Sequence, residues 1–251
     1  MLKRKAKFIG HFFIFYAYMK IADQLKLIVS STLDVIYPNL CATCSDNLKS
    51  NENFLCLNCL YDLPYILNDE SNQLKLKQLF WGREDVENIY SLLSYQKGNQ
   101  VQDILHLIKY KQKTHFAKYL GRKLGDIITK EACRFDMILP VPLHPKKLKK
   151  RGFNQSVLLA NGINEVLDVP ITEKSIQRIR HNPTQTSIDK YDRWDNVRDV
   201  FAVSTPKKLI NKHVLLVDDV LTTGATVEAC LKQLLKIDNC KVSVATLAAR
   251  I

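Results

Sequence analysis

Glycine and proline are scarce in this chain of 251 residues, which has eight of each. Long low-complexity linkers and collagen-like repeats need many more of both, so neither is expected. No internal repeat recurs at the periods of about 20–50 residues that mark solenoids and propellers. With 46% hydrophobic and 25% charged residues, the composition is that of an ordinary globular protein. The length allows one large domain, or one medium domain with a small appendage.

Acidic residues are too few to balance the basic ones. The 37 Lys and Arg stand against 25 Asp and Glu, which gives a formal net charge of +12. An excess of this kind indicates an anionic partner. Nucleic acid, a phosphorylated small molecule and an acidic membrane surface each meet that requirement.

The sequence also lacks a clear membrane-spanning run near its start. Residues 8–19 are mostly apolar and follow a basic segment, but about 12 residues fall short of the ~20 that a spanning helix needs. A secretory signal has the same order of basic head and apolar body, yet Gly10 and His11 interrupt the run and no small-residue cleavage site follows. Three interpretations stay open for residues 1–30: a true start at Met19, peripheral attachment to a membrane, or a signal.

An odd number of cysteines, seven, argues against a simple disulfide framework. Four of them form two C-x-x-C pairs, Cys41 with Cys44 and Cys56 with Cys59. A tight turn lets each pair direct two sulfurs at one point, so together they can supply four ligands to tetrahedral Zn²⁺. Four thiolates leave no coordination position open, which predicts a structural zinc. Two disulfides or a redox pair are the alternatives, and a reducing cytoplasm favours zinc. The other cysteines lie in apolar stretches and are expected in or near the core: Cys133, Cys230 and Cys240.

Short apolar segments alternate with amphipathic ones through the rest of the chain. The predicted strands are residues 89–95, 137–139, 214–217 and 242–247. Three- and four-residue spacing of apolar side chains predicts helices over residues 101–133, with a break near Lys113, and over 155–167 and 226–236. This alternation indicates βαβ units around a buried parallel sheet, an α/β fold. Ligands of such sheets bind beyond the carboxyl ends of the strands.

The stretch VLLVDDVLTTGAT, residues 214–226, carries the most specific signal. Asp218 and Asp219 follow four apolar strand residues, and a loop of small and hydroxylated residues then leads into a helix. Backbone amides at a helix N-terminus can cradle a phosphate, and the candidates here are Thr222, Thr223, Gly224, Ala225 and Thr226. The two carboxylates can accept hydrogen bonds from sugar hydroxyls and support Mg²⁺ through those hydroxyls or water. The combination predicts a ribose 5-phosphate site, whereas an ordinary helix cap would account for one threonine and one aspartate.

This stretch closely resembles the signature with which type I phosphoribosyltransferases bind phosphoribosyl pyrophosphate (PRPP). The segments DMILPVPLHPKKLKKRGFNQS, residues 136–156, and 178–201 further resemble the ComF family. The cysteine pairs, the proline-rich loop and the signature also occur in that family's order. Members are associated with DNA uptake and natural competence. The resemblance covers residues 33–249 and implies a double zinc ribbon ahead of a phosphoribosyltransferase-type domain.

We therefore expect four parts along the chain. They are an N-terminal extension (1–30), a zinc-ribbon module (31–67), a connection (68–88) and a phosphoribosyltransferase-like domain (89–251) with a parallel sheet flanked by helices. A cytoplasmic location fits the cysteines, and peripheral attachment through the extension would bring the protein to the inner face of the membrane.

By position, the resemblance assigns a grip on pyrophosphate to the loop after an early strand: Val141, Pro142, Leu143, His144 and Arg151. Five cations within residues 146–151 can neutralise such a group, and Arg151 is suited to bidentate contact. The alternatives are a solvated basic loop or one that touches a nucleic-acid backbone. His144 is either an acid or base in the reaction or an ordinary loop histidine.

Residues 178–196 resemble the mobile loop that closes over the active site and excludes water. The candidates within it are Thr184, Gln185, Arg193 and Asn196. A charged surface helix that begins at Ser187 is the alternative.

If the site is active, Mg²⁺-bound PRPP would lose pyrophosphate and an amine or ring nitrogen would attack the ribose. No base-binding pocket can be recognised from the sequence. The competing hypothesis is a non-catalytic module that recognises a nucleotide or PRPP, while the zinc ribbon and basic surfaces hold single-stranded DNA or a competence helicase. Lysines of residues 109–123 and 146–151 would then track phosphates. A membrane scaffold depends on residues 1–30 alone.

Overall fold

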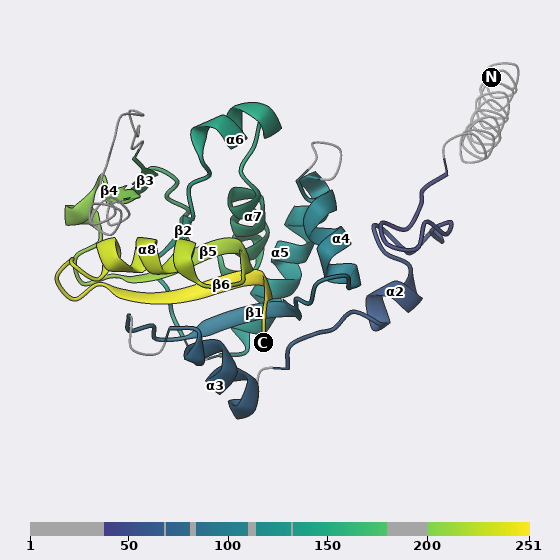
Figure 1. Ribbon diagram of the computed structural model, residues 1–251, viewed down its shortest axis with the longest axis horizontal. Coiled ribbons are helices and arrows are strands. Elements are labelled where there is room, and N and C mark those ends of the chain that lie inside the picture. The colour runs from purple at the N-terminus through teal and green to yellow at the C-terminus, as the bar shows by residue number, and fades with distance from the viewer. Residues whose placement is uncertain (1–37, 68, 81–83, 110–113, 132, 180–199) are drawn as a thin grey trace, which may run out of the picture. The chain divides into compact units, whose positions relative to one another are not determined.

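The computed structural model describes residues 38–67, 69–80, 84–109, 114–131, 133–179 and 200–251 (Figure 1). Backbone contacts divide the chain into two compact units, Met1–Tyr61 and Asp62–Ile251. The described part of the first unit contains the short helix α2 (Leu57–Tyr61). The extension expected over residues 1–30, with the alternative start at Met19, lies outside the described residues.

A four-stranded sheet in the order β1-β6-β5-β2 forms the centre of the second unit (Figure 1). Its strands are β1 (Ile89–Ser94), β2 (Met137–Pro140), β5 (His213–Leu221) and β6 (Lys241–Ala249). Each neighbouring pair is parallel, which confirms the predicted α/β architecture. A separate antiparallel pair is formed by β3 (Ile176–Arg178) and β4 (Phe201–Val203), followed by the 3-10 turn η2 (Pro206–Lys208).

Helices cover both faces of the sheet. The helices described in this unit are α3 (Glu70–Gln78), α4 (Gln100–Leu107), α5 (Thr114–Thr129), α6 (Pro145–Arg151), α7 (Gln155–Leu167) and α8 (Ala225–Leu234), of which α6 buries none of its residues. Val214 and Leu216 of β5 pack in one apolar cluster with residues of α3 and α8. Alternate strand residues face opposite sides, so α5 and α7, whose buried side chains lie outside that cluster, cover the other face. Among the described helices, none combines the length and apolarity needed to span a bilayer.

Helices α5 and α7 approach closely because glycines face each other where they cross. A Cβ atom on Gly121 would meet the backbone of α7, and one on Gly162 would meet the carbonyl of Lys118. Across the same contact, Glu165 pairs with Lys118 at 2.6 Å and with Arg122 at 3.1 Å. Lys118, one of the helix lysines expected to track phosphates, is therefore paired within the protein.

Residues 68–88, expected only to connect two modules, contain a helix that contributes to the core. Oδ1 of Asp69 caps α3 by accepting a hydrogen bond from the Asn72 amide at 2.8 Å. Leu76 and Phe80 are 0% and 3% exposed and belong to the apolar cluster of the sheet. The few apolar side chains of residues 68–88 lie among many polar ones, so the sequence shows no clear helical pattern there.

Strand β5 runs further than expected. The apolar run 214–217 predicted an end before the acidic pair, but pairing with β6 continues from Asp218 with Thr246 to Leu221 with Ala249. The bonds to β6 use backbone groups only, so polar side chains do not end the strand. The acidic pair therefore lies within β5, ahead of its carboxyl end.

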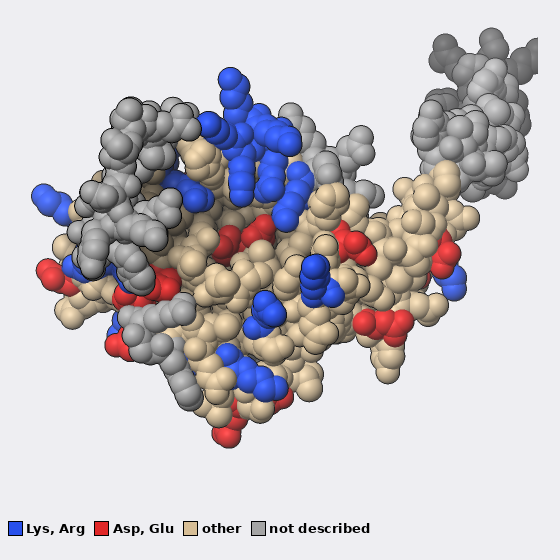
Figure 2. Space-filling view, viewed as in Figure 1, with Lys and Arg blue, Asp and Glu red and all other residues tan. Residues whose placement is uncertain are grey.

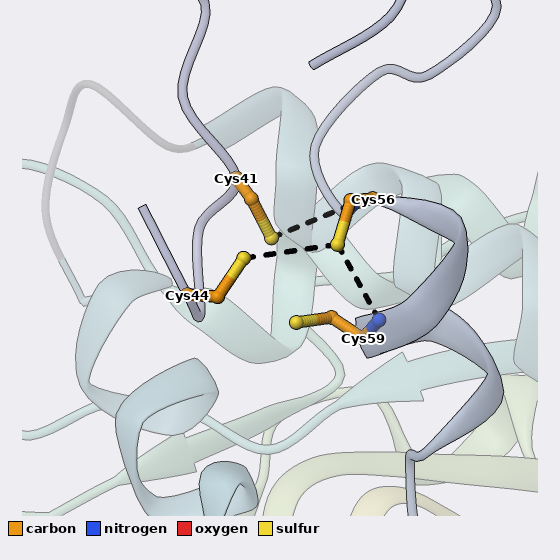
Figure 3. A group of neighbouring side chains, drawn as sticks. All are labelled: Cys41, Cys44, Cys56 and Cys59. Atoms are coloured by element: carbon orange, nitrogen blue, oxygen red, sulfur yellow. Dashed lines mark hydrogen bonds between the residues drawn. The ribbon is translucent and has the colours of Figure 1, made fainter. Parts of the chain in front are cut away.

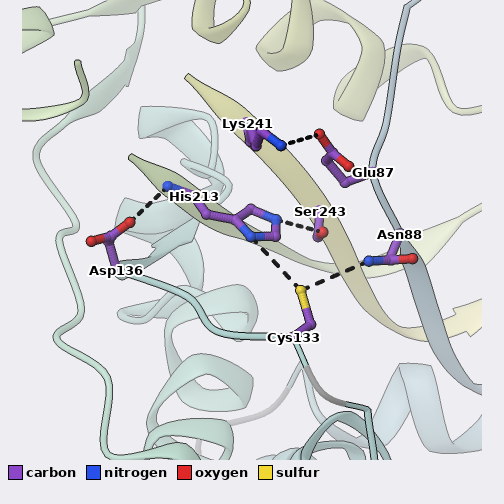
Figure 4. Close-up of polar contacts among 7 residues, drawn as sticks. All are labelled: Glu87, Asn88, Cys133, Asp136, His213, Lys241 and Ser243. Carbon is purple, nitrogen blue, oxygen red and sulfur yellow. Dashed lines mark hydrogen bonds and ion pairs between the residues drawn. The ribbon is translucent and has the colours of Figure 1, made fainter. Parts of the chain in front are cut away.

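Polar side chains cluster at the amino-terminal edge of the sheet (Figure 4). Nδ1 of His213 lies 3.7 Å from Sγ of Cys133, and its Nε2 lies 2.9 Å from Oγ of Ser243. Nδ2 of Asn88 lies 3.8 Å from the same sulfur, and the His213 amide donates to Asp136 at 2.8 Å. Cys133 thus has a polar, partly exposed setting. The other two single cysteines are buried as expected: Cys230 and Cys240.

The setting of His213 predicts a loss of stability on acidification. Burial lowers its pKa from the usual value of 6.5. The positive charge of Lys241 acts in the same direction, whereas the negative charges of Glu87 and Asp136 act to raise the pKa. The folded protein therefore takes up this proton less readily than the unfolded chain. Stability from this source is complete above about pH 6.5 and is lost as the pH falls toward the lower pKa of the folded state.

We expect the free energy of unfolding in urea to fall between about pH 7.5 and about pH 5.5, and to fall less in His213→Gln than in the wild type. The matched control is His115→Gln, which removes an exposed histidine. It should retain the wild-type pH dependence. An unchanged dependence in His213→Gln would show that burial of this imidazole is not the cause.

Candidate functional site

The carboxyl-terminal part of β5 borders an open pocket. Its lining residues are Asp218, Val220, Leu221, Thr222, Thr223, Gly224, Ala225, Thr226 and Val227. All five residues predicted to cradle a phosphate are among them. The first turn of α8 belongs to this lining, and amides of a first helical turn have no partner within the helix. The positive end of the helix dipole therefore lies at the pocket, where it favours an anion.

Gly224 shapes the turn that leads from β5 into α8. Its φ of 76° places it in the left-handed region, where side chains other than glycine are strained. A Cβ atom at this position would lie 3.3 Å from Cε1 of Phe80. The segment that follows α3 thus packs behind the turn and helps to fix the path of the pocket's lining.

Asp218 lies in the pocket with one carboxylate oxygen already engaged. Its Oδ1 accepts hydrogen bonds from Oγ of Ser156 at 3.1 Å and from the amide of Asp219 at 2.9 Å. Burial and the charge of Asp219 raise the pKa of Asp218 to about 7, and the two hydrogen bonds limit the rise. Burial also raises the pKa of Asp219, although the positive charges of Lys109 and Arg151 act to lower it. Two acids whose ionised forms are short of partners are suited to receive hydroxyl donors or a cationic ligand.

The basic segment predicted to grip pyrophosphate is a short helix instead of a loop. Nδ1 of His144 caps α6 by accepting from the amide of Lys146 at 3.2 Å. The helix ends at Gly152, whose φ is 81° and whose amide donates to the carbonyl of Leu148 at 2.7 Å. The capping role of His144 favours the interpretation of an ordinary structural histidine.

Helix α6 presents its charges at the same edge of the sheet as the pocket. None of its residues is buried, and Lys and Arg side chains gather over it (Figure 2). The preceding loop begins beside β5, because the amide of Val141 donates to the carbonyl of Val217 at 2.8 Å. That loop comprises Val141, Pro142, Leu143 and His144. This loop therefore starts beside the strand that carries the acidic pair, and the charge of Arg151 acts to lower the pKa of Asp219.

Two further residues near the acidic pair had no role assigned from the sequence. Ser156 belongs to a conspicuous motif and donates to Asp218. The guanidinium of Arg178 lies 5.4 Å from the ring centroid of Phe201, and its charge opposes the rise in the pKa of Asp218 that burial causes. Both residues act on Asp218 from segments far away in the chain, so no local sequence spacing predicts these interactions. The residues predicted for a closing loop lie outside the described residues: Thr184, Gln185, Arg193 and Asn196.

The four N-terminal cysteines come together in the first unit (Figure 3). Their sulfur atoms all lie within 4.8 Å of one another, as ligands of one metal such as zinc can. The sulfurs of Cys44 and Cys56 are 3.7 Å apart. That separation suits the edge of a tetrahedron with Zn–S bonds of about 2.3 Å, and it far exceeds a disulfide bond of about 2.05 Å. The amides of Cys56 and Cys59 donate to the sulfurs of Cys41 and Cys56 at 3.3 and 3.4 Å.

The surroundings of the cluster favour the thiolate form of one cysteine more than that of another. Burial acts to raise the pKa of Cys41, but donation from the amides of Cys44 and Cys56 lowers it to about 6. Burial and the neighbouring sulfurs raise the pKa of Cys59. The backbone thus stabilises one thiolate, whereas a divalent cation would hold all four.

Sequence comparisons identify similar proteins. A family model described as "Phosphoribosyl transferase domain" matches residues 154–251, which include the acidic pair and the cradle. Competence protein F of Haemophilus influenzae is 27% identical over 223 residues, which cover 86% of this chain and 93% of that protein. DNA utilization protein YhgH of Escherichia coli O157:H7 is 31% identical over 147 residues, which cover 56% of this chain and 63% of that protein.

Solved structures give weaker matches. One titled as the structure of the allosteric regulatory enzyme of purine biosynthesis has a TM-score of 0.39 at 21% identity and covers 53% of this chain and 25% of its own. A hypothetical protein from Neisseria gonorrhoeae with bound ppGpp has a TM-score of 0.35 at 24% identity and covers 57% of this chain and 70% of its own.

The cysteine geometry predicts about one tightly held metal ion per chain in protein purified without chelator. Cys56→Ser should lose most of it because one thiolate ligand is removed. Metal content, measured by plasma mass spectrometry, checks this. Cys133→Ser, outside the cluster, should keep the full content. A wild-type content near zero, or full occupancy in Cys56→Ser, would contradict the proposed ligand set.

Proposed function

We propose that this chain is a ComF-family protein, and that its second unit binds PRPP with Mg²⁺ and transfers its phosphoribosyl group. The observation that carries the proposal is that Asp218 and the loop entering α8 line one pocket. A phosphate held by the first turn of α8 would place its ribose beside a carboxylate. That carboxylate can accept hydrogen bonds from the sugar hydroxyls.

The acidic pair also fits a magnesium-bearing ligand. Burial raises the pKa of Asp218 and of Asp219, so added positive charge nearby would stabilise their ionised forms. Bound with PRPP, Mg²⁺ would supply charge that stabilises the departing pyrophosphate. Asp218 and Asp219 would hold the Mg²⁺ ion through the sugar hydroxyls or water. The loop of residues 141–144 and Arg151 would hold the pyrophosphate, with Arg151 as the bidentate donor.

In the reaction we propose, the bond between the ribose C1 and the pyrophosphate oxygen breaks, and a nitrogen of the acceptor forms the new bond to C1. The protein has two tasks in this step. The cradle and the acidic pair fix the ribose, and the cations of α6 stabilise the charge that develops on the leaving group.

We also propose that the first unit holds a structural zinc ion through Cys41, Cys44, Cys56 and Cys59, because four thiolates leave no position open for a substrate. The names of the similar proteins, competence protein F and DNA utilization protein, support a role of this chain in the uptake or use of DNA.

Loss of the acidic pair tests the proposal. In Asp218→Asn with Asp219→Asn, we expect the affinity for Mg-PRPP to fall at least about tenfold, the loss expected when a charge-assisted hydrogen bond of about 1.5–3 kcal/mol is removed. Calorimetric titration measures it. The double variant should unfold at the same or a higher temperature than the wild type, because burial disfavours the charges it removes.

Asp126→Asn is the matched control, since it removes an exposed carboxylate of α5. It should bind as the wild type does. Full affinity in a folded double variant, or no binding of Mg-PRPP by the wild type, would refute the proposed site.

A second candidate function, binding of single-stranded DNA or of an acidic surface of a competence helicase, is favoured by α6. Its cations form no ion pair with any described residue, and none of the helix is buried. If they track a DNA backbone, the affinity for single-stranded DNA should fall steeply with added salt, and less steeply in Lys147→Gln with Lys150→Gln. An affinity that salt does not change would exclude this interaction.

A further inference from the structure

The segment of residues 136–156 resembles the ComF family, and its last residues, 153–156, belong neither to the cradle nor to the basic segment. It ends at Ser156, in the first turn of α7, and this serine is 3% exposed. A buried hydroxyl requires a hydrogen-bond partner. The partner is a carboxylate of the proposed ribose site, because Oγ donates to Oδ1 of Asp218 at 3.1 Å.

The two oxygens of Asp218 have different surroundings. Oδ1 receives two donors, the Ser156 hydroxyl and the Asp219 amide at 2.9 Å. Two donors match the two lone pairs of a carboxylate oxygen, so Oδ1 is satisfied within the protein. No hydrogen bond from the described residues reaches Oδ2. The carboxylate therefore has one oxygen fixed by the fold and one left to accept a donor.

A chain of hydrogen bonds holds Ser156 in place. Nδ2 of Asn154 donates to the carbonyl of Val141 at 2.9 Å, and Oδ1 of Asn154 accepts from the Ser156 amide at 3.1 Å. Asn154 thereby caps α7 and ties its start to the loop that follows β2. The same chain of contacts continues through Ser156 to β5. The proposed pyrophosphate loop and the acidic pair are thus joined through one helix N-terminus.

We propose that Ser156 is a positioning residue of the ribose site, which holds Oδ1 of Asp218 so that Oδ2 is presented to a sugar hydroxyl. This inference rests on the proposed function. Without the serine, the Asp218 carboxylate could turn about its side-chain torsions and would have to be ordered when the ligand binds. A side chain ordered in advance avoids that loss of affinity.

The expected effect is selective for the sugar. Both inorganic phosphate and ribose 5-phosphate can occupy the cradle, but only ribose 5-phosphate has hydroxyls for Asp218. In Ser156→Ala, we expect the affinity for ribose 5-phosphate to fall about tenfold, as for one hydrogen bond to a charged group. The affinity for inorganic phosphate should stay within about twofold of the wild type, since a twofold change corresponds to less than about 0.5 kcal/mol.

The experiment is a calorimetric titration of the full chain with each ligand. Ser156→Thr keeps the hydroxyl and should recover most of the affinity for ribose 5-phosphate. Ser243→Ala removes another buried serine hydroxyl, at the opposite edge of the sheet where it lies 2.9 Å from Nε2 of His213. That control should bind both ligands as the wild type does.

Three other outcomes would overturn the inference. If the wild type binds ribose 5-phosphate no better than inorganic phosphate, the proposed function itself fails. If the wild type prefers the sugar and Ser156→Ala keeps that preference, only the role of Ser156 fails. If folded Ser156→Ala loses both ligands equally, the serine supports the local structure and does not position Asp218.

Discussion

Backbone pairing of β5 with β2 on one side and with β6 on the other sets the positions of the acidic pair, of residues 222–226 and of the loop that leads to α6. Pro140 of β2 lies opposite Val217 of β5, so the loops that follow both strands leave the sheet at the same edge. On the other side, pairing of Asp218 with Thr246 extends β5 beyond its apolar run and keeps the carboxylate within the sheet. Because the strands are parallel, one edge gathers the cradle, the acidic pair and the basic segment.

The same pairing makes the site costly to build. Burial raises the pKa of both aspartates, which means that the fold disfavours the charges that the proposed function requires. The surroundings reduce this cost in specific ways. The Ser156 hydroxyl and the Asp219 amide satisfy one oxygen of Asp218, and the charges of Lys109 and Arg151 act on Asp219. A ligand that brings hydroxyl donors and a cation would further stabilise the ionised forms of the two aspartates.

Local sequence patterns predicted the parts whose causes are local. The alternation of strands and helices, the α4–α5 pair, the gathering of residues 222–226 at one pocket and the cysteine cluster follow from periodicity or short spacing. The patterns missed α3, because it has few apolar residues. Its place in the fold depends on the packing of Leu76, and of Phe80 just after the helix, in the apolar cluster of the sheet. They also ended β5 too early, since the partner strand decides where pairing stops. The contact of Ser156 with Asp218 joins positions 62 residues apart, so only the fold brings them together.

We propose a ribose 5-phosphate site at this edge of the sheet, and a crystal structure of the protein with ribose 5-phosphate would test that proposal most directly. We expect the phosphate at about 2.7–3.2 Å from backbone amides of residues 222–226, with a sugar hydroxyl donating to Oδ2 of Asp218. A well-ordered ligand bound on α6 or elsewhere, with water alone in the pocket beside Asp218, would contradict it.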